Sequence, residues 1–341
     1  MSLREKVISL GERIEWPDMI TRAGIGWLVS RTERELASSP PLVPHFARAM
    51  SDYPIALNTA DANRQHYELP AAFFRTFLGP RLKYSCCLFD GQDDTLAAAE
   101  ERALAATCDY AGLVDGQDIL ELGCGWGSLS LWIAERYPNS RILSVSNSHS
   151  QREFIMRRAA EANLLNIEVV TADMNAFTID MRFDRIVSVE MFEHMANWQT
   201  LLSRVATWLK PEGRLYIHIF SHENAPYRFD HTDKTDWIAQ HFFTGGIMPS
   251  HDLMHHFPES FAVEREWRWN GMHYSRTAQH WLDNFDKNRA AIDEVLSSVY
   301  CSDAQLWRRR WRLFLLATMG LFGHSEGRVW GVSHYRLRPT V

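Results

Sequence analysis

The chain has 341 residues, of which 46% are hydrophobic and 23% are charged, and its formal net charge is −6. This is the composition of an ordinary globular protein that can bury a large core. The acidic balance argues against a protein that mainly holds nucleic acid, because such proteins carry a basic surplus. Five cysteines without a C-x-x-C pair predict reduced thiols, and the N-terminus lacks the apolar segment of a signal peptide. We therefore expect a cytoplasmic protein.

The N-terminal segment, residues 1–93, is expected to form a helical cap that covers a substrate. Residues 1 to about 50 have helical periodicity that is interrupted at Pro17 and at Pro40-Pro41. The apolar residues that recur at helical spacing before the first proline are Leu3, Val7, Leu10 and Ile14. Such an amphipathic helix would pack on its own domain or on a second subunit, with a membrane surface as the alternative. Residues 51–93 are irregular and rich in aromatic side chains.

Residues 94–341 are predicted to form an α/β domain. A helix is expected over 95–113, and from Asp118 onward short apolar runs alternate with longer amphipathic stretches. The predicted strands are 119–122, 142–145, 167–171, 185–189 and 215–220, with helices at 129–136, 151–163 and 199–209 between them. This alternation predicts a Rossmann-like parallel sheet with helices on both faces. An irregular insert at about 222–260 would add to the cap, followed by a strand at 261–269, helices at 275–300 and 303–322, and a last strand at 329–337.

A glycine turn, Glu121-Leu122-Gly123-Cys124-Gly125-Trp126-Gly127, follows the first predicted strand directly. Such a turn lets the backbone approach a ligand closely, with helix N–H groups pointing at it. Ser128 stands where a dinucleotide fingerprint needs its third glycine or alanine, and no acidic residue ends the second strand to hold a nicotinamide ribose. Glu121 can instead accept the amino group of a methionine. Asp173, after the third strand, can accept an adenine amino group, with Met174 as an apolar contact. The motif therefore favours S-adenosylmethionine over NAD.

A second constellation, Glu190-Met191-Phe192-Glu193-His194, ends the fourth predicted strand, where open α/β sheets gather their active sites. Two carboxylates and an imidazole could include the general base that methyl transfer to a protonated amine needs. The alternative is structural: one glutamate caps the next helix, and His194 forms a hydrogen bond with the backbone. We expect at least one of the two glutamates and the histidine to have such a structural role.

Other polar residues carry weaker signals. Cys86, His218 and Tyr274, taken singly, are more often satisfied core residues than catalysts. His255 and His256 lack the rest of a ligand set, so no metal is expected. The arginines of the run 307–312 spread around a helix, which favours a solvated face with internal ion pairs over phosphate binding.

The chain resembles the cyclopropane-fatty-acid synthase superfamily, and within it the coclaurine N-methyltransferase branch. The motifs that carry the resemblance are residues 65–70, 82–86, the glycine turn with Trp126, Asn147 with Gln151, 190–195, 242–250, 273–274 and the tail from 321 to 335. The resemblance implies a class I methyltransferase that converts S-adenosylmethionine to S-adenosylhomocysteine. It also implies that the cofactor is contacted by Tyr84, Ser85, Gly123, Gly125, Trp126, Asn147, Gln151, Asp173 and Met174, besides Glu121.

The coclaurine-type branch implies N-methylation of a small aromatic or cyclic amine. Glu193 would then be the substrate-facing acid/base, His194 its partner or the base itself, and Glu190 the orienting carboxylate. Phe242 and Trp330 would shape the substrate pocket, and family habit suggests a homodimer through the N-terminal helices.

The lipid branch implies a second chemistry, methylene transfer to an unsaturated acyl chain at a membrane. There Cys86, Glu193, His218 and Tyr274 would surround a bicarbonate ion that accepts a proton. The tail departs from the alkaloid pattern, since this chain has Val329 and Gly320 where relatives typically carry glutamate. That difference leaves the identity of the acceptor open.

Overall fold

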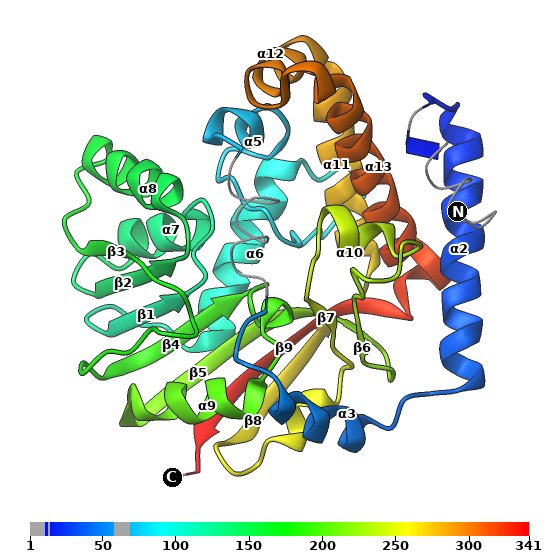
Figure 1. The fold of residues 1–341 in the computed structure, drawn as a ribbon. Coiled ribbons are helices and arrows are strands. Elements are labelled where there is room, and N and C mark those ends of the chain that lie inside the picture. The colour runs from blue at the N-terminus through cyan, green and yellow to red at the C-terminus, as the bar shows by residue number, and fades with distance from the viewer. Residues whose placement is uncertain (1–10, 13, 58–68, 341) are drawn as a thin grey trace.

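The computed structural model describes residues 11–12, 14–57 and 69–340, and one seven-stranded sheet is its centre (Figure 1). The strand order is β3-β2-β1-β4-β5-β9-β8, in which the first five strands are parallel and β9 is antiparallel to both its neighbours. The strands are β1 (Asp118–Leu122), β2 (Arg141–Ser146), β3 (Ile167–Thr171), β4 (Phe183–Val189), β5 (Leu209–His222), β8 (Phe261–Trp269) and β9 (Trp330–Pro339). The predicted Rossmann-like α/β fold is confirmed.

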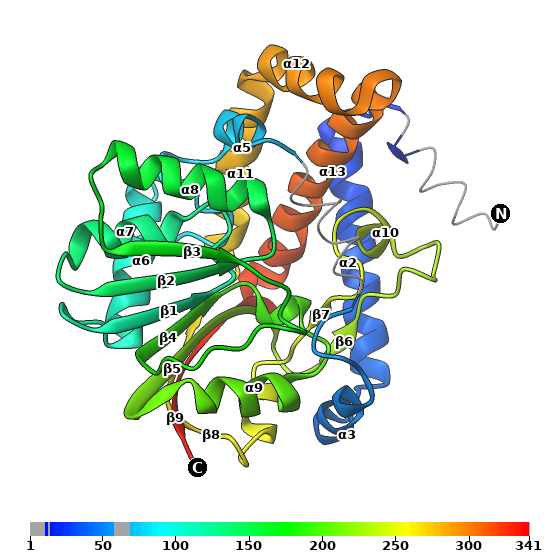
Figure 2. The same cartoon turned by 60° about the vertical axis from the view of Figure 1, so that its left-hand side comes forward.

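Helices cover both faces of the sheet (Figure 2). The first four are α6 (Leu96–Ala111), α7 (Ser128–Arg136), α8 (His149–Glu161) and α9 (Trp198–Thr207). Helices α6, α7 and α8 pack on one face, and α9 packs on the other. Successive side chains of a strand point to opposite faces of the sheet, so each strand contributes to the hydrophobic clusters on both faces. In β1, for example, Ile119 joins one buried cluster and Leu120 the other.

The C-terminal helices differ from the prediction in one respect. The stretch expected to be a single helix at 275–300 is α11 (Met272–Lys287) followed by α12 (Arg289–Tyr300). The break falls at Asn288, whose side-chain amide donates to the carbonyl of Thr76 at 2.7 Å, a bond that ties the turn to the N-terminal segment. Helix α13 (Ala304–Gly323) then leads through η6 (His324–Gly327) to β9.

The N-terminal segment forms α2 (Asp18–Ser38) and α3 (Val43–Ala49), and it continues through η1 (Met50–Asp52) to α5 (Ala71–Phe77). Helix α2 begins directly after Pro17 and ends before Pro40, as the prolines predicted. It lies alongside α13, away from the sheet (Figure 1). Leu3, Val7 and Leu10, on which the amphipathic helix was predicted, and the motif at residues 65–68 lie outside the described residues.

The arginine run of α13 binds the beginning of the chain. The pairs are Arg308 with Glu15 at 2.6 Å, Arg310 with Glu12 at 3.0 Å, and Arg312 with Asp18 at 2.6 Å. The run therefore makes ion pairs, as the sequence predicted, but it does not form the predicted solvated face, because Arg308 is buried. The pairs hold the segment before α2 and the first residue of α2 against α13.

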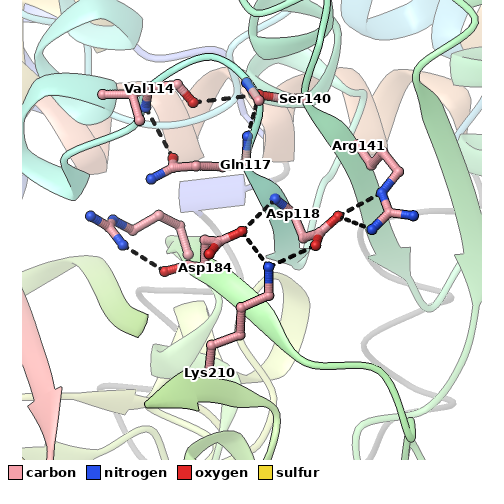
Figure 3. Close-up of polar contacts among 9 residues, drawn as sticks. Val114, Gln117, Asp118, Ser140, Arg141, Asp184 and Lys210 are labelled. Atoms are coloured by element: carbon pink, nitrogen blue, oxygen red, sulfur yellow. Dashed lines mark hydrogen bonds and ion pairs between the residues drawn. The ribbon is translucent and has the colours of Figure 1, made fainter. Parts of the chain in front are cut away.

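The amino ends of the strands are joined by a polar cluster (Figure 3). The ammonium of Lys210 lies 2.8 Å from Asp118 and 2.7 Å from Asp184, and Asp118 also pairs with Arg141. These contacts link β1, β2, β4 and β5 at the amino ends of the strands. The candidate site residues lie at the opposite edge of the sheet, at the carboxyl ends.

The insert between β5 and β8 contains β6 (Tyr227–Arg228), α10 (Trp237–His241), β7 (Ile247–Met248) and η4 (Leu253–His256). Strands β6 and β7 form a small antiparallel sheet of their own. Across the part of the chain that the structure describes, no helix combines the length and apolar character needed to cross a membrane.

Candidate active site

A cavity of about 940 Å³ lies at the carboxyl ends of β1 to β4 and extends to α2, α13 and the insert. One end is the glycine turn after β1, and the other is lined by aromatic and aliphatic side chains from elements far apart in the sequence. A cleft at this edge is expected for an open parallel sheet, because loops diverge there. The cavity is large enough for two small molecules side by side.

The glycine turn forms one wall of the cavity. Gly123 has φ +82° and Gly125 has φ +50°, a left-handed conformation that side chains disfavour. A Cβ on Gly123 would lie 2.6 Å from Cγ of Met191, so the turn packs closely against the residue after Glu190. A Cβ on Gly125 would meet no atom within 4 Å, because Gly125 faces the open cavity.

Glu121 lies beneath this turn and is 2% exposed. Its carboxylate accepts hydrogen bonds from the hydroxyls of Ser130 and Ser144. Burial raises the pKa of Glu121 to about 7, although the two hydroxyls oppose the shift. A cation bound above the turn would therefore meet a carboxyl group that can ionise near neutral pH.

The structure brings all ten predicted cofactor residues to the wall of one cavity. They are Tyr84, Ser85, Glu121, Gly123, Gly125, Trp126, Asn147, Gln151, Asp173 and Met174. Asn147, Gln151 and Asp173 follow the ends of β2 and β3, so they lie along the same edge of the sheet as the turn. The side chain of Gln151 is held by the hydroxyl of Ser146 at 2.7 Å.

The carboxylate of Glu190, at the cavity wall, contacts three polar groups of the chain. Its residue has φ +47°, an uncommon conformation for a side chain other than glycine, directly after β4. Oε1 accepts the backbone N–H of Cys86 at 2.9 Å and lies 3.2 Å from Nε2 of His218, and Oε2 accepts the hydroxyl of Tyr274 at 2.6 Å. Burial raises the pKa of Glu190, while the charge of Lys83 and the donors from Cys86 and Tyr274 lower it.

Glu193 and His194 lie in η3 (Phe192–His194) but have different surroundings. His194 lines the cavity, where its ring centroid is 4.4 Å from that of Phe243, and burial lowers the pKa of His194 to about 4. Glu193 is fully buried and lies outside the residues that line the cavity. Its Oε1 accepts the backbone N–H of Phe220 at 2.7 Å, and its Oε2 has no hydrogen-bond partner among the described residues. Burial, followed by the charge of Glu190, raises the pKa of Glu193 well above its usual range.

The six predicted catalytic residues therefore form two layers. Glu190, His194 and Tyr274 reach the cavity, whereas Cys86, Glu193 and His218 lie behind them. The sequence predicted a different arrangement, in which Glu193 faces the substrate and Glu190 is the orienting carboxylate. The reason is local, because the backbone of Glu190 is left-handed at the end of β4. Glu190 and Glu193 therefore do not share a helical face.

The two predicted substrate residues are buried outside the lining of the cavity. Phe242 packs against Phe314 and Trp311, with ring centroids at 4.5 and 5.1 Å, and its neighbour Phe243 lines the cavity instead. Trp330 packs against His222 at 5.0 Å. Both support the wall from behind. Phe242 directly follows α10 and turns away from the cavity that its neighbour Phe243 lines, and Trp330 is the first residue of β9.

Sequence reasoning missed several residues of the wall. Lys83 is buried there, and its ammonium donates to the hydroxyl of Ser85 at 2.5 Å and to the carbonyl of Cys86 at 2.7 Å. Helices α2 and α13 contribute apolar side chains such as Leu28 and Phe314. Lys83 lies within the motif at residues 82–86, so the sequence could have indicated it, whereas the approach of α2 to α13 leaves no pattern in the sequence.

A family model, curated proteins and solved structures all match this chain to the same group of related proteins. A family model described as mycolic acid cyclopropane synthetase matches residues 56–331. An (S)-coclaurine N-methyltransferase of Thalictrum flavum subsp. glaucum is 34% identical over 332 residues, which cover 96% of this chain and 88% of that protein. A cyclopropane-fatty-acyl-phospholipid synthase of Escherichia coli (strain K12) is 28% identical over 271 residues, covering 79% and 66% of the two chains. A crystal structure of a coclaurine N-methyltransferase bound to N-methylheliamine and SAH matches with a TM-score of 0.91 and 31% identity, over 98% of this chain and 99% of that one.

Proposed function

This chain belongs to the mycolic acid cyclopropane synthetase family and is an S-adenosylmethionine-dependent methyltransferase, and we propose that it methylates the nitrogen of a small aromatic or cyclic amine. The observation that carries the proposal is the ionisable pair at the cavity wall, the carboxylate of Glu190 and the imidazole of His194. The aromatic rings beside them, Phe220, Phe229 and Phe243, suit an acceptor that is flat and partly cationic.

The end of the cavity at the glycine turn would hold the methyl donor. Glu121 and the turn at Gly123–Gly125 would receive its methionine end, and Asp173 with Met174 its adenine. The donor supplies an electrophilic methyl group on a sulfonium. The chain's own residues orient this group and keep water from it, as the burial of the turn and of Trp126 supports.

The other end would bind and deprotonate the amine. A carboxylate has about four lone-pair positions; at Glu190 two have donors, from Cys86 and Tyr274, and a third faces Nε2 of His218, so one remains for an N–H of the acceptor. Burial opposes a cation here, which lowers the pKa of a bound ammonium as it does that of His194. His194 is therefore neutral at pH 7, and its free-base ring would take the proton while the amine lone pair attacks the methyl group.

The N-terminal segment, residues 1–93, of which 11–12, 14–57 and 69–93 are described, and the insert at 222–260 would form the cap. They contribute Ile20, Leu28, Phe229 and Trp237 to the cavity wall, opposite the sheet. We therefore extend the proposal to a substrate enclosed between the sheet of the methyltransferase domain, residues 94–341, and these two segments, the second of which is an insert within that domain.

Methylene transfer to lipid is the second candidate, and the polar site argues against it. Three of the residues expected to surround bicarbonate, Cys86, His218 and Tyr274, bond the chain's own Glu190, whose carboxylate has the charge and shape of that ion. The fourth, Glu193, bonds the backbone of Phe220. These residues therefore do not fit a bicarbonate ion, and we derive no step through it.

A panel of acceptors tests the proposed function. Purified protein would be incubated with S-adenosylmethionine and, separately, with bicyclic aromatic amines, simple aliphatic amines and vesicles of unsaturated phospholipid. Release of S-adenosylhomocysteine is expected with the cyclic aromatic amines and with neither of the others. Release that depends on lipid alone would overturn the amine assignment.

The pKa of Glu121 yields a prediction for cofactor affinity. Because burial raises this pKa to about 7, the group is protonated at lower pH, and binding a cationic amino group must first remove the proton. The affinity for S-adenosylmethionine is expected to fall by about tenfold for each pH unit below that value and to level off above it. Calorimetry across this range measures it, and Glu121→Gln should give a weaker affinity that no longer varies with pH. A variant that keeps the pH dependence would assign it to another group.

A further inference from the structure

The cavity wall carries acidic residues and a single basic one. Among the described residues that line it, Lys83 is the one lysine, and none is an arginine. The acidic residues of the same lining are Glu121, Asp173, Glu190, Asp233 and Asp236. Lys83 directly precedes the cofactor residues Tyr84 and Ser85, and it is 3% exposed. A lysine is rarely buried to this degree without a partner of opposite charge, so its surroundings require an explanation.

The ammonium of Lys83 bonds two uncharged groups. It donates to the hydroxyl of Ser85 at 2.5 Å and to the backbone carbonyl of Cys86 at 2.7 Å. Its positive charge opposes the rise that burial causes in the pKa of both Glu100 and Glu190. Of the described residues, however, neither of these carboxylates accepts a hydrogen bond from the ammonium. Lys83 is therefore a buried cation whose direct partners are neutral.

Two hydrogen-bond donors at this point of the wall have no acceptor among the described residues. An ammonium has three N–H groups, and the bonds to Ser85 and Cys86 use two of them. Because an ammonium can only donate, the Ser85 oxygen is the acceptor in their bond, and the proton of its own hydroxyl remains available. Lys83 and Ser85 both line the cavity, so an N–H, an O–H and a positive charge meet at its wall. A carboxylate, with two acceptor oxygens and a negative charge, matches this set.

The segment that carries these donors lies beside the glycine turn. The ring of Phe74 packs against both Tyr84 and Trp126, with ring centroids at 5.3 and 5.1 Å, so the two segments share a neighbour. The backbone N–H of Cys86 also donates to Glu190 at 2.9 Å, directly after β4, and β4 is paired with β1, the strand that leads into the turn. Lys83 and Ser85 are thus at the end of the cavity assigned to the methyl donor.

We propose that Lys83 and Ser85 bind the carboxylate at the methionine end of S-adenosylmethionine. That molecule has one carboxylate besides its ammonium and sulfonium groups, and the described wall offers one cation to receive it. Glu121, beneath the turn, is then left for the ammonium, so the two charged groups of the amino-acid end meet separate partners of opposite sign. The inference rests on the proposed placement of the methyl donor at the glycine turn, and it is independent of the identity of the acceptor.

Ligands with and without the carboxylate test the assignment by binding alone. The probes are S-adenosylhomocysteine and its decarboxylated analogue, which keeps the amino group, and both are titrated calorimetrically above the Glu121 pKa of about 7. Lys83→Met is expected to weaken the binding of S-adenosylhomocysteine by roughly ten- to a hundredfold, the usual contribution of charge-assisted hydrogen bonds, and that of the analogue by less than about threefold. Equal losses for the two ligands would overturn the proposal.

Ser85→Ala tests the same site if Lys83→Met fails to fold, because it removes only one hydroxyl group. The variant is expected to bind S-adenosylhomocysteine roughly three- to tenfold more weakly and to bind the decarboxylated analogue as before. A loss of affinity that is the same for both ligands, or no loss at all, contradicts the assignment of the Ser85 hydroxyl as a carboxylate donor and with it the proposed pair.

Lys210→Met is the matched control for the lysine variant. The ammonium of Lys210 also has two acceptors, Asp118 and Asp184, but it lies at the amino ends of the strands, away from the cavity (Figure 3). Its replacement should leave the affinities for both ligands unchanged. A selective loss of S-adenosylhomocysteine affinity in Lys210→Met equal to that in Lys83→Met would trace the effect to a general change of the fold and overturn the inference.

This inference and the proposed function fail separately. If the unaltered protein binds S-adenosylhomocysteine no more tightly than the decarboxylated analogue, the carboxylate site is wrong and the amine reaction is unaffected. If the protein shows the expected preference for the carboxylate but transfers no methyl group to amines, the proposed acceptor is wrong and the roles of Lys83 and Ser85 stand.

Discussion

Replacing His194 by alanine is expected to lower kcat by roughly two to four orders of magnitude, the usual contribution of a general base. The side chain lies on the cavity wall, and burial lowers its pKa to about 4, so it is neutral at physiological pH. It can take the proton of the bound ammonium because the same burial lowers the pKa of that ammonium as well. The affinity for S-adenosylmethionine should change little, because His194 is separate from the glycine turn. Steady-state kinetics and calorimetry on the same preparation measure the two effects.

His255→Ala is the matched control for that variant. His255 also lies in a 3-10 helix, η4, but it is exposed and pairs with Glu266 on the surface. Its loss should leave kcat within a factor of about two, since exposed pairs contribute little. A His194→Ala enzyme with nearly normal turnover would exclude His194 as the base and direct attention to the carboxylate of Glu190, which also lines the cavity.

Gly125→Ala is expected to weaken the binding of S-adenosylmethionine by roughly ten- to a hundredfold. The residue has φ +50° and faces the cavity, so a methyl group there would project into the space assigned to the cofactor. Overlap of one added carbon with a well-packed ligand costs about 1–3 kcal/mol, which corresponds to that range of affinity. Calorimetric titration at fixed pH gives the dissociation constant.

Gly116→Ala separates this effect from backbone strain. Gly116 has φ +91°, and a Cβ there would also meet nothing within 4 Å, but it lies before β1 at the opposite end of the sheet. Both variants should lose about 1–2 kcal/mol of stability from the left-handed conformation. Only Gly125→Ala should lose cofactor affinity, and equal affinity loss in both would remove the turn from the proposed binding site.

The parts of the site that follow from strand ends were predictable from the sequence. A glycine turn after β1, a polar residue after β2 and an acidic residue after β3 must meet, because parallel strands end at one edge of a sheet. The same reasoning brought Glu190 to the site. It could not assign the roles of Glu190 and Glu193, because the left-handed residue at the end of β4 turns the two side chains apart.

The cap was predictable only as a segment. Prolines marked the limits of α2, yet its position against α13 depends on contacts between residues about 300 positions apart, such as Asp18 with Arg312. Likewise, Phe242 and Phe243 are equivalent in sequence, and only the fold of the insert determines which of them faces the cavity. Aperiodic segments carry no pattern that indicates a direction, so these details needed the structure.

The central claim is methyl transfer to nitrogen, and the isotopic composition of the product tests it most directly. The protein would be given S-adenosylmethionine with a fully deuterated methyl group, together with cyclic aromatic amines and unsaturated phospholipid in one reaction, followed by mass spectrometry. The account predicts an amine product that retains all the deuterium of the methyl group, with the lipid unchanged. A lipid product that has gained the carbon but lost one deuteron per transfer would identify methylene transfer and contradict the account.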